Sequence, residues 1–366
     1  PEVRARRRGW LLGGAVVLTV AAIVAALLVA IKPDERAGDR EPIAVDKCDK
    51  SRGELVVGLI APLSGELAGI GTGMRNAAEL AVDEANRNCT VPGYRLAFRP
   101  LDDTSNESVA TTAAMALATD AAMVGVVGPL YGDAAKATQP VLAAAGVVQL
   151  AASAGSPSLT RGTDSVARRP YPGYFRVYGN FDLEGDVTAE WLVRREGRRM
   201  VAIVDDGSSY GQSNSERFAV RLAALDGKAV FRESMAGSGP ATDFPALAAR
   251  IAAARPDAVF FTGDRPEGGR LSAQLAAAGL NVPLVGLTGL LGSGTYEGRD
   301  GDIAVSTGPE LALLPAAGPF TTAYTARFTE EPGPYGVLSY DAVTVLVTAL
   351  GQITAGSHWD GGTRNA

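Results

Sequence analysis

The sequence predicts an α/β fold in which two lobes, each built on a parallel β-sheet, follow a single transmembrane helix. Three observations support this prediction. Short runs of β-branched residues alternate with alanine-rich stretches, this alternation occurs in two successive series, and the run 10–31 has no charged residue. A chain of 366 residues that is 46% hydrophobic can bury the cores of two or three domains.

The uncharged run from Trp10 to Ile31 is long enough to cross a membrane. A helix rises ~1.5 Å per residue, and the hydrocarbon core of a bilayer is ~30 Å thick. A cleavable signal peptide is the alternative, but its apolar region is usually ~7–15 residues long, and no Leu-x-x-Cys-like acylation site follows this run. We therefore expect an uncleaved membrane anchor.

The charges on either side of the anchor predict its orientation. Residues 1–9 form a basic flank, whereas residues 32–41 mix charges of both signs. Because basic flanks stay in the cytoplasm, we expect a single-pass cell-membrane protein whose N-terminus is cytoplasmic and whose remaining chain is outside. Residues 32–53 are charged and aperiodic, which is typical of a tether. The first residue is Pro rather than Met, so we expect a piece of a longer polypeptide with a cytoplasmic portion before the anchor.

The two cysteines, Cys48 and Cys89, agree with an extracytoplasmic location, because a disulfide persists there but not in a reducing cytosol. Cys48 precedes the first expected strand, and Cys89 follows the first expected helix. In an α/β unit those two ends lie on the same rim of the sheet, so a disulfide is geometrically plausible; two unrelated thiols are the alternative. A metal site is not expected, because the sequence has no short Cys-x-x-Cys and no pair of histidines.

The first series of alternating elements begins at Glu54. Strand, helix and strand in this rhythm predict βαβ crossovers and a parallel sheet that is covered on both faces. The expected strands are 55–61, 94–102, 123–128 and 147–151, and the expected helices are 73–88, 107–118 and 133–145.

A second series with the same rhythm predicts the second lobe. The part that follows it is too short to be a third domain, so we expect it to return to the first lobe. The cleft left by a chain that crosses between lobes is lined by loops at the carboxyl ends of the strands, where ligand contacts are expected. The second series has expected helices at 183–196, 212–226, 243–254 and 267–278, and expected strands at 200–206, 228–235, 258–263 and 283–289. The final part has an expected strand at 302–308 and expected helices at 317–330 and 340–352.

Charge and motif spacing exclude two classes of partner. The formal net charge is −6, and no basic face is visible outside the first ten residues, so nucleic-acid binding is not expected. The series Gly69-x-Gly71-x-Gly73 precedes the first helix, but it matches neither G-x-G-x-x-G nor G-x-x-x-x-G-K-[ST]. We therefore expect no nucleotide and no other cofactor.

The segment Gly207–Gly211 matches G-x-S-x-G between an expected strand and an expected helix, which is the context of an α/β-hydrolase nucleophile. Ser209 would be that nucleophile. A triad also needs a histidine base held by a carboxylate. The only candidate, His358, lies in a glycine-rich segment that would not preorganise a base. A serine hydrolase is therefore a distant alternative.

Two adjacent pairs of aspartates stand at the ends of expected strands: Asp102 with Asp103, and Asp205 with Asp206. With one histidine in the chain, acid and base chemistry would fall to carboxylates. Aspartates in such positions also cap loops and solvated turns. Both interpretations, ligand contact and loop cap, stay open.

Six stretches between about Glu54 and Gln352 resemble the leucine/isoleucine/valine-binding family of type I periplasmic binding proteins. Each stretch is a weak signal alone, but their order and spacing together are specific. The stretches are VGLIAPLSGELAGIGTGMRNAAELAVDEAN (57–86), VGVVGPLYGDAAKATQPVLAAAGV (124–147), ASAGSPSLT (152–160), VAIVDDGSSYGQS (201–213), TDFPALAARIAAARPDAVFFTG (242–263) and GPYGVLSYDAVTVLVTAL (333–350).

The resemblance implies two Rossmann-like lobes, joined by three crossovers, that close around a small molecule. We expect the first lobe at 54–176 with 305–366 and the second at 180–302. Family members continue beyond the helix at 340–352 with a further helix, a β-hairpin and the third crossover. We therefore expect either a truncated segment or an incomplete first lobe.

The resemblance also implies a ligand site, from which this sequence departs. Hydroxyl groups that bind an amino acid's carboxylate match Gly132 and Gly155, which offer only backbone N–H groups, and the acidic partner of the ligand's ammonium matches Thr288. An unpaired buried ammonium would be costly. Either Asp264 or Asp206 is then the counter-ion, or the ligand is not an α-amino acid. The residues expected to contact ligand are Ser64, Tyr131, Gly132, Asp133, Ser153, Ala154, Gly155, Asp206, Tyr210, Asp264 and Thr288.

These observations together predict an extracytoplasmic solute-binding protein rather than an enzyme. Its lobes would close around a small polar solute, an amino acid or a related molecule, for uptake through an ABC permease. The alternative is the ligand-sensing ectodomain of a single-pass receptor with a fused cytoplasmic, kinase-like signalling domain. The codons upstream of Pro1 would distinguish the two.

Overall fold

The computed structural model describes residues 48–161, 169–180, 182–235, 242–291, 296–306 and 311–359. The expected basic flank, the expected membrane anchor at 10–31 and most of the expected tether lie outside the described residues.

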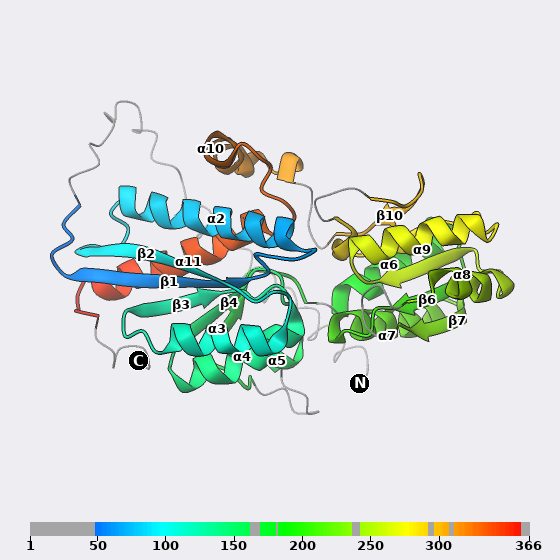
Figure 1. The fold of residues 1–366 in the computed structure, drawn as a ribbon, viewed down its shortest axis with the longest axis horizontal. Coiled ribbons are helices and arrows are strands. Elements are labelled where there is room, and N and C mark those ends of the chain that lie inside the picture. The colour runs from blue at the N-terminus through cyan, green and yellow to red at the C-terminus, as the bar shows by residue number, and fades with distance from the viewer. Residues whose placement is uncertain are drawn as a thin grey trace, which may run out of the picture. The chain divides into compact units, whose positions relative to one another are not determined.

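The first sheet has five parallel strands in the order β2-β1-β3-β4-β5 (Figure 1). Each strand ends at the same edge as its neighbours, because all of the pairings are parallel. The strands are β1 (Gly53–Ala61), β2 (Tyr94–Asp102), β3 (Met123–Val127), β4 (Val148–Ala151) and β5 (Tyr174–Arg176).

Alternate residues of β1 bury the two faces of this sheet. Leu55, Val57 and Leu59 pack with helices α2 (Ala68–Arg87) and α11 (Gly336–Thr354), whereas Val56 and Ile60 pack with helices α3 (Glu107–Ala118) and α4 (Gly132–Ala144). The period of two follows from strand geometry. Helices therefore cover both faces, as predicted. The short helix α5 (Ser158–Arg161) follows β4.

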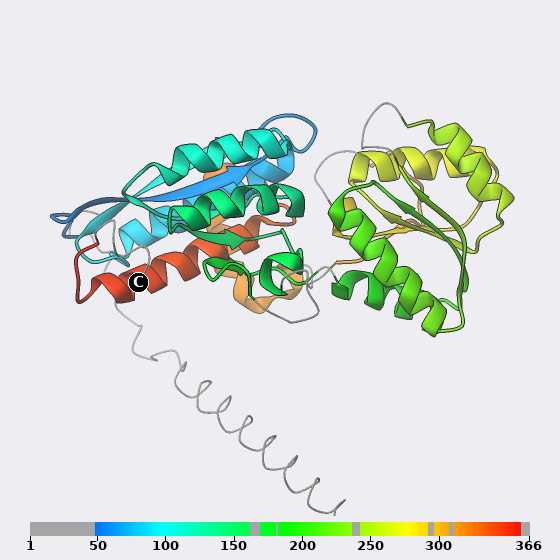
Figure 2. The ribbon, with the colours of Figure 1, turned by 90° about the horizontal axis from the view of Figure 1, so that it is seen from below.

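The second sheet is also parallel and five-stranded, in the order β10-β9-β8-β6-β7. Helices α8 (Phe244–Ala253) and α9 (Arg265–Ala277) cover one face, and α6 (Asp182–Arg194) and α7 (Ser209–Ala224) cover the other (Figures 1 and 2). The strands are β6 (Met200–Asp205), β7 (Lys228–Ser234), β8 (Ala258–Thr262), β9 (Leu284–Gly286) and β10 (Ile303–Ala304).

One prediction about the final part of the chain is wrong. The strand expected at 302–308 consists of only Ile303–Ala304, and it pairs with β9 of the second sheet instead of returning to the first lobe. The return to the first lobe begins later, because helix α10 (Gly318–Phe328) packs on α2 through a cluster that includes Leu80 and Tyr324. Three short 3-10 turns were not predicted: Thr288–Leu291, Leu311–Leu313 and Pro315–Ala317.

Helix α11 is long and apolar enough to cross a membrane by length and composition. Its inward residues Ala342, Val343 and Val347 are nevertheless buried in the core of the first lobe with α2. Burial on one side explains its apolar composition. It is therefore a core helix of this lobe.

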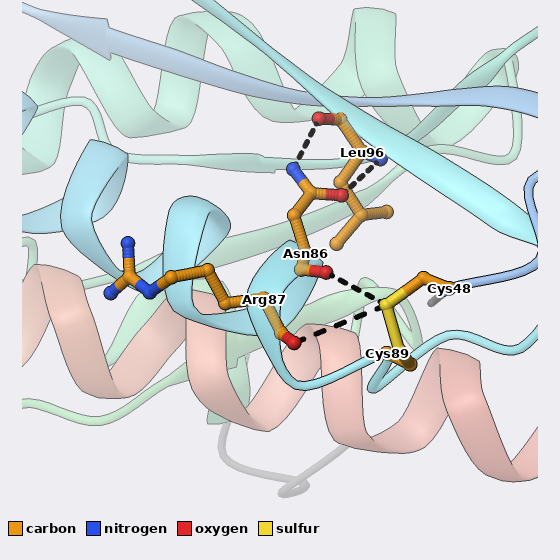
Figure 3. Close-up of a disulfide and its surroundings, with 5 residues drawn as sticks. All are labelled: Cys48, Asn86, Arg87, Cys89 and Leu96. Atoms are coloured by element: carbon orange, nitrogen blue, oxygen red, sulfur yellow. Dashed lines mark hydrogen bonds between the residues drawn. A yellow bond between two sulfur atoms is a disulfide. The ribbon is translucent and has the colours of Figure 1, made fainter. Parts of the chain in front are cut away.

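Cys48 and Cys89 form a disulfide, which confirms that prediction (Figure 3). The two Cα atoms are 5.4 Å apart, within the usual range. Beside the bond, the side chain of Asn86 donates a hydrogen bond to the carbonyl of Leu96 and accepts one from its N–H, each at 2.8 Å. The disulfide thus joins the segment before β1 to the end of α2, whose last turn is also bonded to β2.

Candidate functional site

A cavity of about 520 Å³ lies at the carboxyl ends of strands from both sheets. The loops after β1, β2 and β3 line it from the first lobe, and the loops after β6 and β8 line it from the second lobe. In parallel α/β sheets the carboxyl edge is where loops are free to contact a ligand. A cavity therefore lies where the sequence led us to expect ligand contacts.

Tyr131 and Asp264 join the two lobes across this cavity. Tyr131 occupies the N-cap position of α4 and Asp264 that of α9, and the tyrosine hydroxyl donates a short hydrogen bond to Asp264 Oδ2. Burial, with the nearby Asp264 carboxylate, raises the pKa of Tyr131 well above its ordinary value. Tyr131 therefore stays a neutral donor, which matches the carboxylate it faces.

A second contact between the lobes is built on Asp133. Its Oδ2 accepts a hydrogen bond of 3.0 Å from the N–H of Ser209, the first residue of α7. Lys136 Nζ donates to Asp133 Oδ1 at 3.1 Å and to Ser209 Oγ at 2.9 Å. Burial opposes ionisation of Asp133, but the hydrogen bonds from Ser209 and Lys136 outweigh it and lower the pKa of this carboxyl. Asp133 is thus an anion placed at the positive end of a helix.

Three carboxylates of the second lobe, Asp206, Asp264 and Glu267, line the cavity with raised pKa values. Burial is the main cause for Asp264, and the neighbouring Asp206 and Glu267 add to it, so that its pKa is about 7. Burial also raises the pKa of Asp206, although hydrogen bonds from the Ser208 N–H (2.9 Å) and hydroxyl (2.7 Å) oppose this shift. Perturbed carboxyl groups in a cavity are typical of functional sites.

Sequence reasoning missed Glu184, a carboxylate in α6 that is only 3% exposed. It accepts hydrogen bonds from the hydroxyls of Tyr178 (2.5 Å), Tyr210 (2.6 Å) and Thr288 (3.3 Å). Burial raises its pKa, against these hydrogen bonds. Nothing in the local pattern marks a glutamate in the first turn of a helix as buried. One signal was available: Thr288 stands where the resemblance implies an acidic side chain, which could have prompted a search for a carboxylate on another segment.

Six of the eleven expected ligand contacts line the cavity. They are Tyr131, Gly132, Asp133, Asp206, Tyr210 and Asp264. The other five lie outside its described lining and have other contacts. The hydroxyl of Ser64 donates to Asp102 (2.6 Å), that of Ser153 donates to the Leu130 carbonyl (2.9 Å), the carbonyls of Ala154 and Gly155 accept from Tyr174 and Arg176, and Thr288 contacts Glu184.

The hydrolase alternative fails on geometry. Ser209 Oγ accepts its hydrogen bond from Lys136, at the carboxyl edges of the strands. His358 Nδ1 instead contacts the hydroxyl of Tyr94 at 2.9 Å. Tyr94 is the first residue of β2, so this contact lies at the amino ends of the strands, away from the cavity. Ser209 and His358 therefore do not form a nucleophile–base pair.

Within the described residues, no group of three or more acidic, His or Cys side chains could hold a metal ion.

Comparison with known proteins agrees with this geometry. The family model described as periplasmic binding protein matches residues 54–363. The chain is 31% identical over 237 residues to the Leu/Ile/Val-binding protein BraC3 of Rhizobium johnstonii, which covers 65% of this chain and 62% of that protein. The chain thus spans less than two thirds of that relative.

Solved structures share the fold. The substrate-binding protein LivJ from Streptococcus pneumoniae in complex with isoleucine superposes with a TM-score of 0.72 at 24% identity, covering 85% of this chain and 86% of the other. A solute-binding protein from Rhodopseudomonas palustris in complex with 3,4-dihydroxybenzoic acid gives 0.70 at 23% identity, covering 85% and 84%. The same fold thus accommodates ligands with and without an amino group.

Proposed function

The chain belongs to the periplasmic binding protein family, and from that premise we propose that it is an extracytoplasmic solute-binding protein whose two lobes close around a small polar ligand for ABC-type uptake. One observation carries the proposal: loops from the carboxyl ends of both sheets line a single cavity. The Tyr131–Asp264 and Asp133–Ser209 contacts join the lobes beside it. A ligand that adds contacts to both lobes would favour the closed arrangement.

A binding screen tests this function. The full chain, in lipid nanodiscs, is heated with amino acids, amides, small acids and small amines, and hits are measured by calorimetric titration. A ligand at ~100 times its dissociation constant adds ~2.7 kcal/mol of stability. We expect Tyr131→Ala to abolish the response, because it removes a cavity wall and an inter-lobe donor. Phe175→Ala, which removes an exposed ring of β5, should retain the response. No response to any class of solute would contradict the proposal.

Membrane attachment and the partner belong to the same proposal. The uncharged run 10–31 would anchor the protein with its N-terminus in the cytoplasm and its binding lobes outside. An anchored binding protein would stay near the ABC permease to which it delivers solute. Protease accessibility of the lobes in intact cells, compared with that of an N-terminal epitope tag, tests this orientation.

The receptor alternative receives no support from the comparisons. The relative and the two solved structures named above are binding proteins by description, and two of the three descriptions mention a transporter. Sequencing the reading frame upstream of Pro1 tests this alternative, because an open frame that encodes a kinase-like domain would favour a fused cytoplasmic signalling domain.

A further inference from the structure

The described wall of the cavity is acidic. Six of its described lining residues carry carboxylates, and none of them is a lysine, arginine or histidine. The carboxylates come from both lobes, so closing the lobes brings negative charges together. The six are Glu66, Glu107, Asp133, Asp206, Asp264 and Glu267.

Basic side chains outside the lining pair with two of the six. Lys136 lies 3.1 Å from Asp133, and Arg270 lies 3.1 Å from Glu267. Within the parts of the chain that the structure describes, the other four form no ion pair. Arg265, next to Asp264, is directed elsewhere: its guanidinium donates to the Leu290 carbonyl at 2.7 Å and stacks over the ring of Tyr296.

The two inner carboxylates, Asp206 and Asp264, follow adjacent strands and face the same space. Burial is the largest cause of the raised pKa of both carboxyl groups, and the charge of Asp206 raises the pKa of Asp264 further. A positive charge placed between them would oppose these shifts, because an opposite charge within a few ångströms favours the ionised form of a carboxyl group. Their arrangement therefore favours a cationic group in the cavity.

The side chains matched to the family's carboxylate-binding hydroxyls are missing, and two neighbouring donors are occupied. Gly132 and Gly155 have no side chain, and the hydroxyl of Ser153 is bonded to the Leu130 carbonyl. The N-terminus of α7, which would attract an anion, already holds the carboxylate of Asp133. A carboxylate on the ligand would therefore meet the acidic wall, with backbone N–H groups at the start of α4 and the hydroxyls of Thr104 and Ser105 as the donors left in the described lining.

Building on the proposed function, we propose that the ligand is a small organic cation that carries no carboxylate group. Asp206 and Asp264 supply the counter-charge, and the rings of Tyr131 and Tyr210, which also line the cavity, stabilise the cation through its attraction to their faces. The unpaired rim carboxylates Glu66 and Glu107 attract such a ligand toward the cavity.

Matched pairs of compounds test the charge requirement. Leucine is compared with 3-methylbutylamine, and ornithine with 1,4-diaminobutane, because each pair differs only by the carboxylate. Calorimetric titration uses the full chain in nanodiscs. We expect each amine to bind at least about ten-fold tighter than its parent amino acid, which corresponds to about 1.4 kcal/mol. Amino acids that bind as tightly as the amines would overturn this inference and leave the proposed function intact. No binding by either class or by any screened solute would overturn both.

Two variants locate the counter-charge. Asp206→Asn and Asp264→Asn should each weaken amine binding about ten-fold or more, and each retains an oxygen that accepts the hydrogen bonds made by the native carboxylate. Glu54→Gln is the matched control, since it makes the same kind of change at the amino end of β1, where Glu54 pairs with Arg95. Circular dichroism checks that each variant folds. Unchanged amine affinity in both aspartate variants contradicts the inference.

Discussion

Each lobe has a pair of adjacent aspartates at a strand end, and the two pairs have different roles. In the first lobe, Asp102 accepts hydrogen bonds from the N–H groups of Leu63 and Thr104, each at 2.8 Å, so it holds its own loops. Slight burial opposes ionisation of Asp102, but its hydrogen bonds outweigh that effect and lower its pKa. In the second lobe, Asp206 lines the cavity with a raised pKa. The same sequence signal thus marks a loop cap in one lobe and a ligand contact in our proposal for the other.

The lobes also differ in what stabilises them. The first lobe contains the Cys48–Cys89 disulfide and the added helices α10 and α11, whereas the chain has no further cysteine for the second lobe. Burial raises the pKa of one carboxyl group beside β2 in the first lobe, Asp103, and of four in the second lobe, Glu184, Asp206, Asp264 and Glu267. The comparison indicates that the first lobe is the more strongly cross-linked part of the molecule and that the second lobe bears more of the free-energy cost of burying charge. Four predictions test it.

Removing the disulfide should have the largest effect. The bond closes a loop with a sequence separation of 41, for which the chain-entropy model gives about 4 kcal/mol. We expect Cys48→Ser with Cys89→Ser to lower the unfolding temperature of the first lobe and to separate its transition from that of the second. Calorimetry with and without a reducing agent measures this. The double variant is its own control, since reduction should not affect it further. A single transition shifted for both lobes would contradict the comparison.

A matched pair of glycine variants should have the next largest effect. A Cβ at Gly71 in α2 would collide with the carbonyl of Pro62, and one at Gly211 in α7 would collide with the carbonyl of Thr262 (2.7 Å) and with Asp206. Overpacking of this kind costs about 1–3 kcal/mol. We expect Gly71→Ala and Gly211→Ala both to reduce stability in denaturant titrations, but only Gly211→Ala to weaken ligand binding.

The control for this pair is Gly318→Ala at the start of α10, where an added Cβ meets open space. It should leave both stability and binding near wild type. Equal loss of ligand affinity in Gly71→Ala would show that the first lobe contributes more to the site than the comparison holds.

Stability should depend on pH through Asp264. Its folded pKa is about 7, raised from 3.8, with Tyr131, Asp206, Glu267 and Glu66 as its charged or polar neighbours. A raised carboxyl pKa stabilises the fold fully below pH ~4, and this contribution is lost as the pH rises through 7. Asp264→Asn should therefore be more stable than wild type at pH 8, by roughly 1–2 kcal/mol, and lose that advantage at pH 4. Thermal unfolding from pH 4 to 8 measures the difference. Parallel profiles would contradict the assignment.

The smallest effect should separate the two aspartate pairs directly. Asp102→Asn removes a charge from a loop-capping side chain and should cost about 1 kcal/mol of stability while leaving ligand affinity unchanged. Asp206→Asn should do the reverse, with weaker binding and slightly higher stability at neutral pH. Denaturant titration and calorimetry on the same samples give both quantities. Loss of affinity in Asp102→Asn would remove the distinction between the pairs.

Much of the fold could be predicted because the signals are local. Alternating and continuous apolar runs such as 55–61 and 258–263 define strands that are buried on both faces, and their order fixes a parallel sheet. The start of α2 was placed too late, because Gly69, Gly71 and Gly73 are typical of a loop. They lie inside the helix, and position 71 is a glycine because the Pro62 carbonyl is too close for a Cβ atom. The two-residue strand β10 was assigned to the wrong lobe, since its composition does not say which sheet edge it joins.

The site could be predicted only in part, for a related reason. Residues at strand ends, such as Tyr131, Asp206 and Asp264, are placed by the fold, so the sequence locates them in the cavity. Whether Ser153 or Thr288 faces the cavity depends on hydrogen bonds formed after packing. Glu184 depends on hydroxyls from three distant segments, which no local pattern brings together.

The disulfide at the first described residue has a mechanical consequence. A pull on the chain ahead of Cys48 passes through the sulfur–sulfur bond into the end of α2, in parallel with the peptide that leads into β1. Asn86, one residue before the end of that helix, is hydrogen-bonded to Leu96 of β2 (Figure 3). Tension would therefore be shared between helix α2, the inner strand β1 and the edge strand β2, instead of acting on β1 alone. Force applied to the chain ahead of Cys48 would thus reach three elements of the first lobe together.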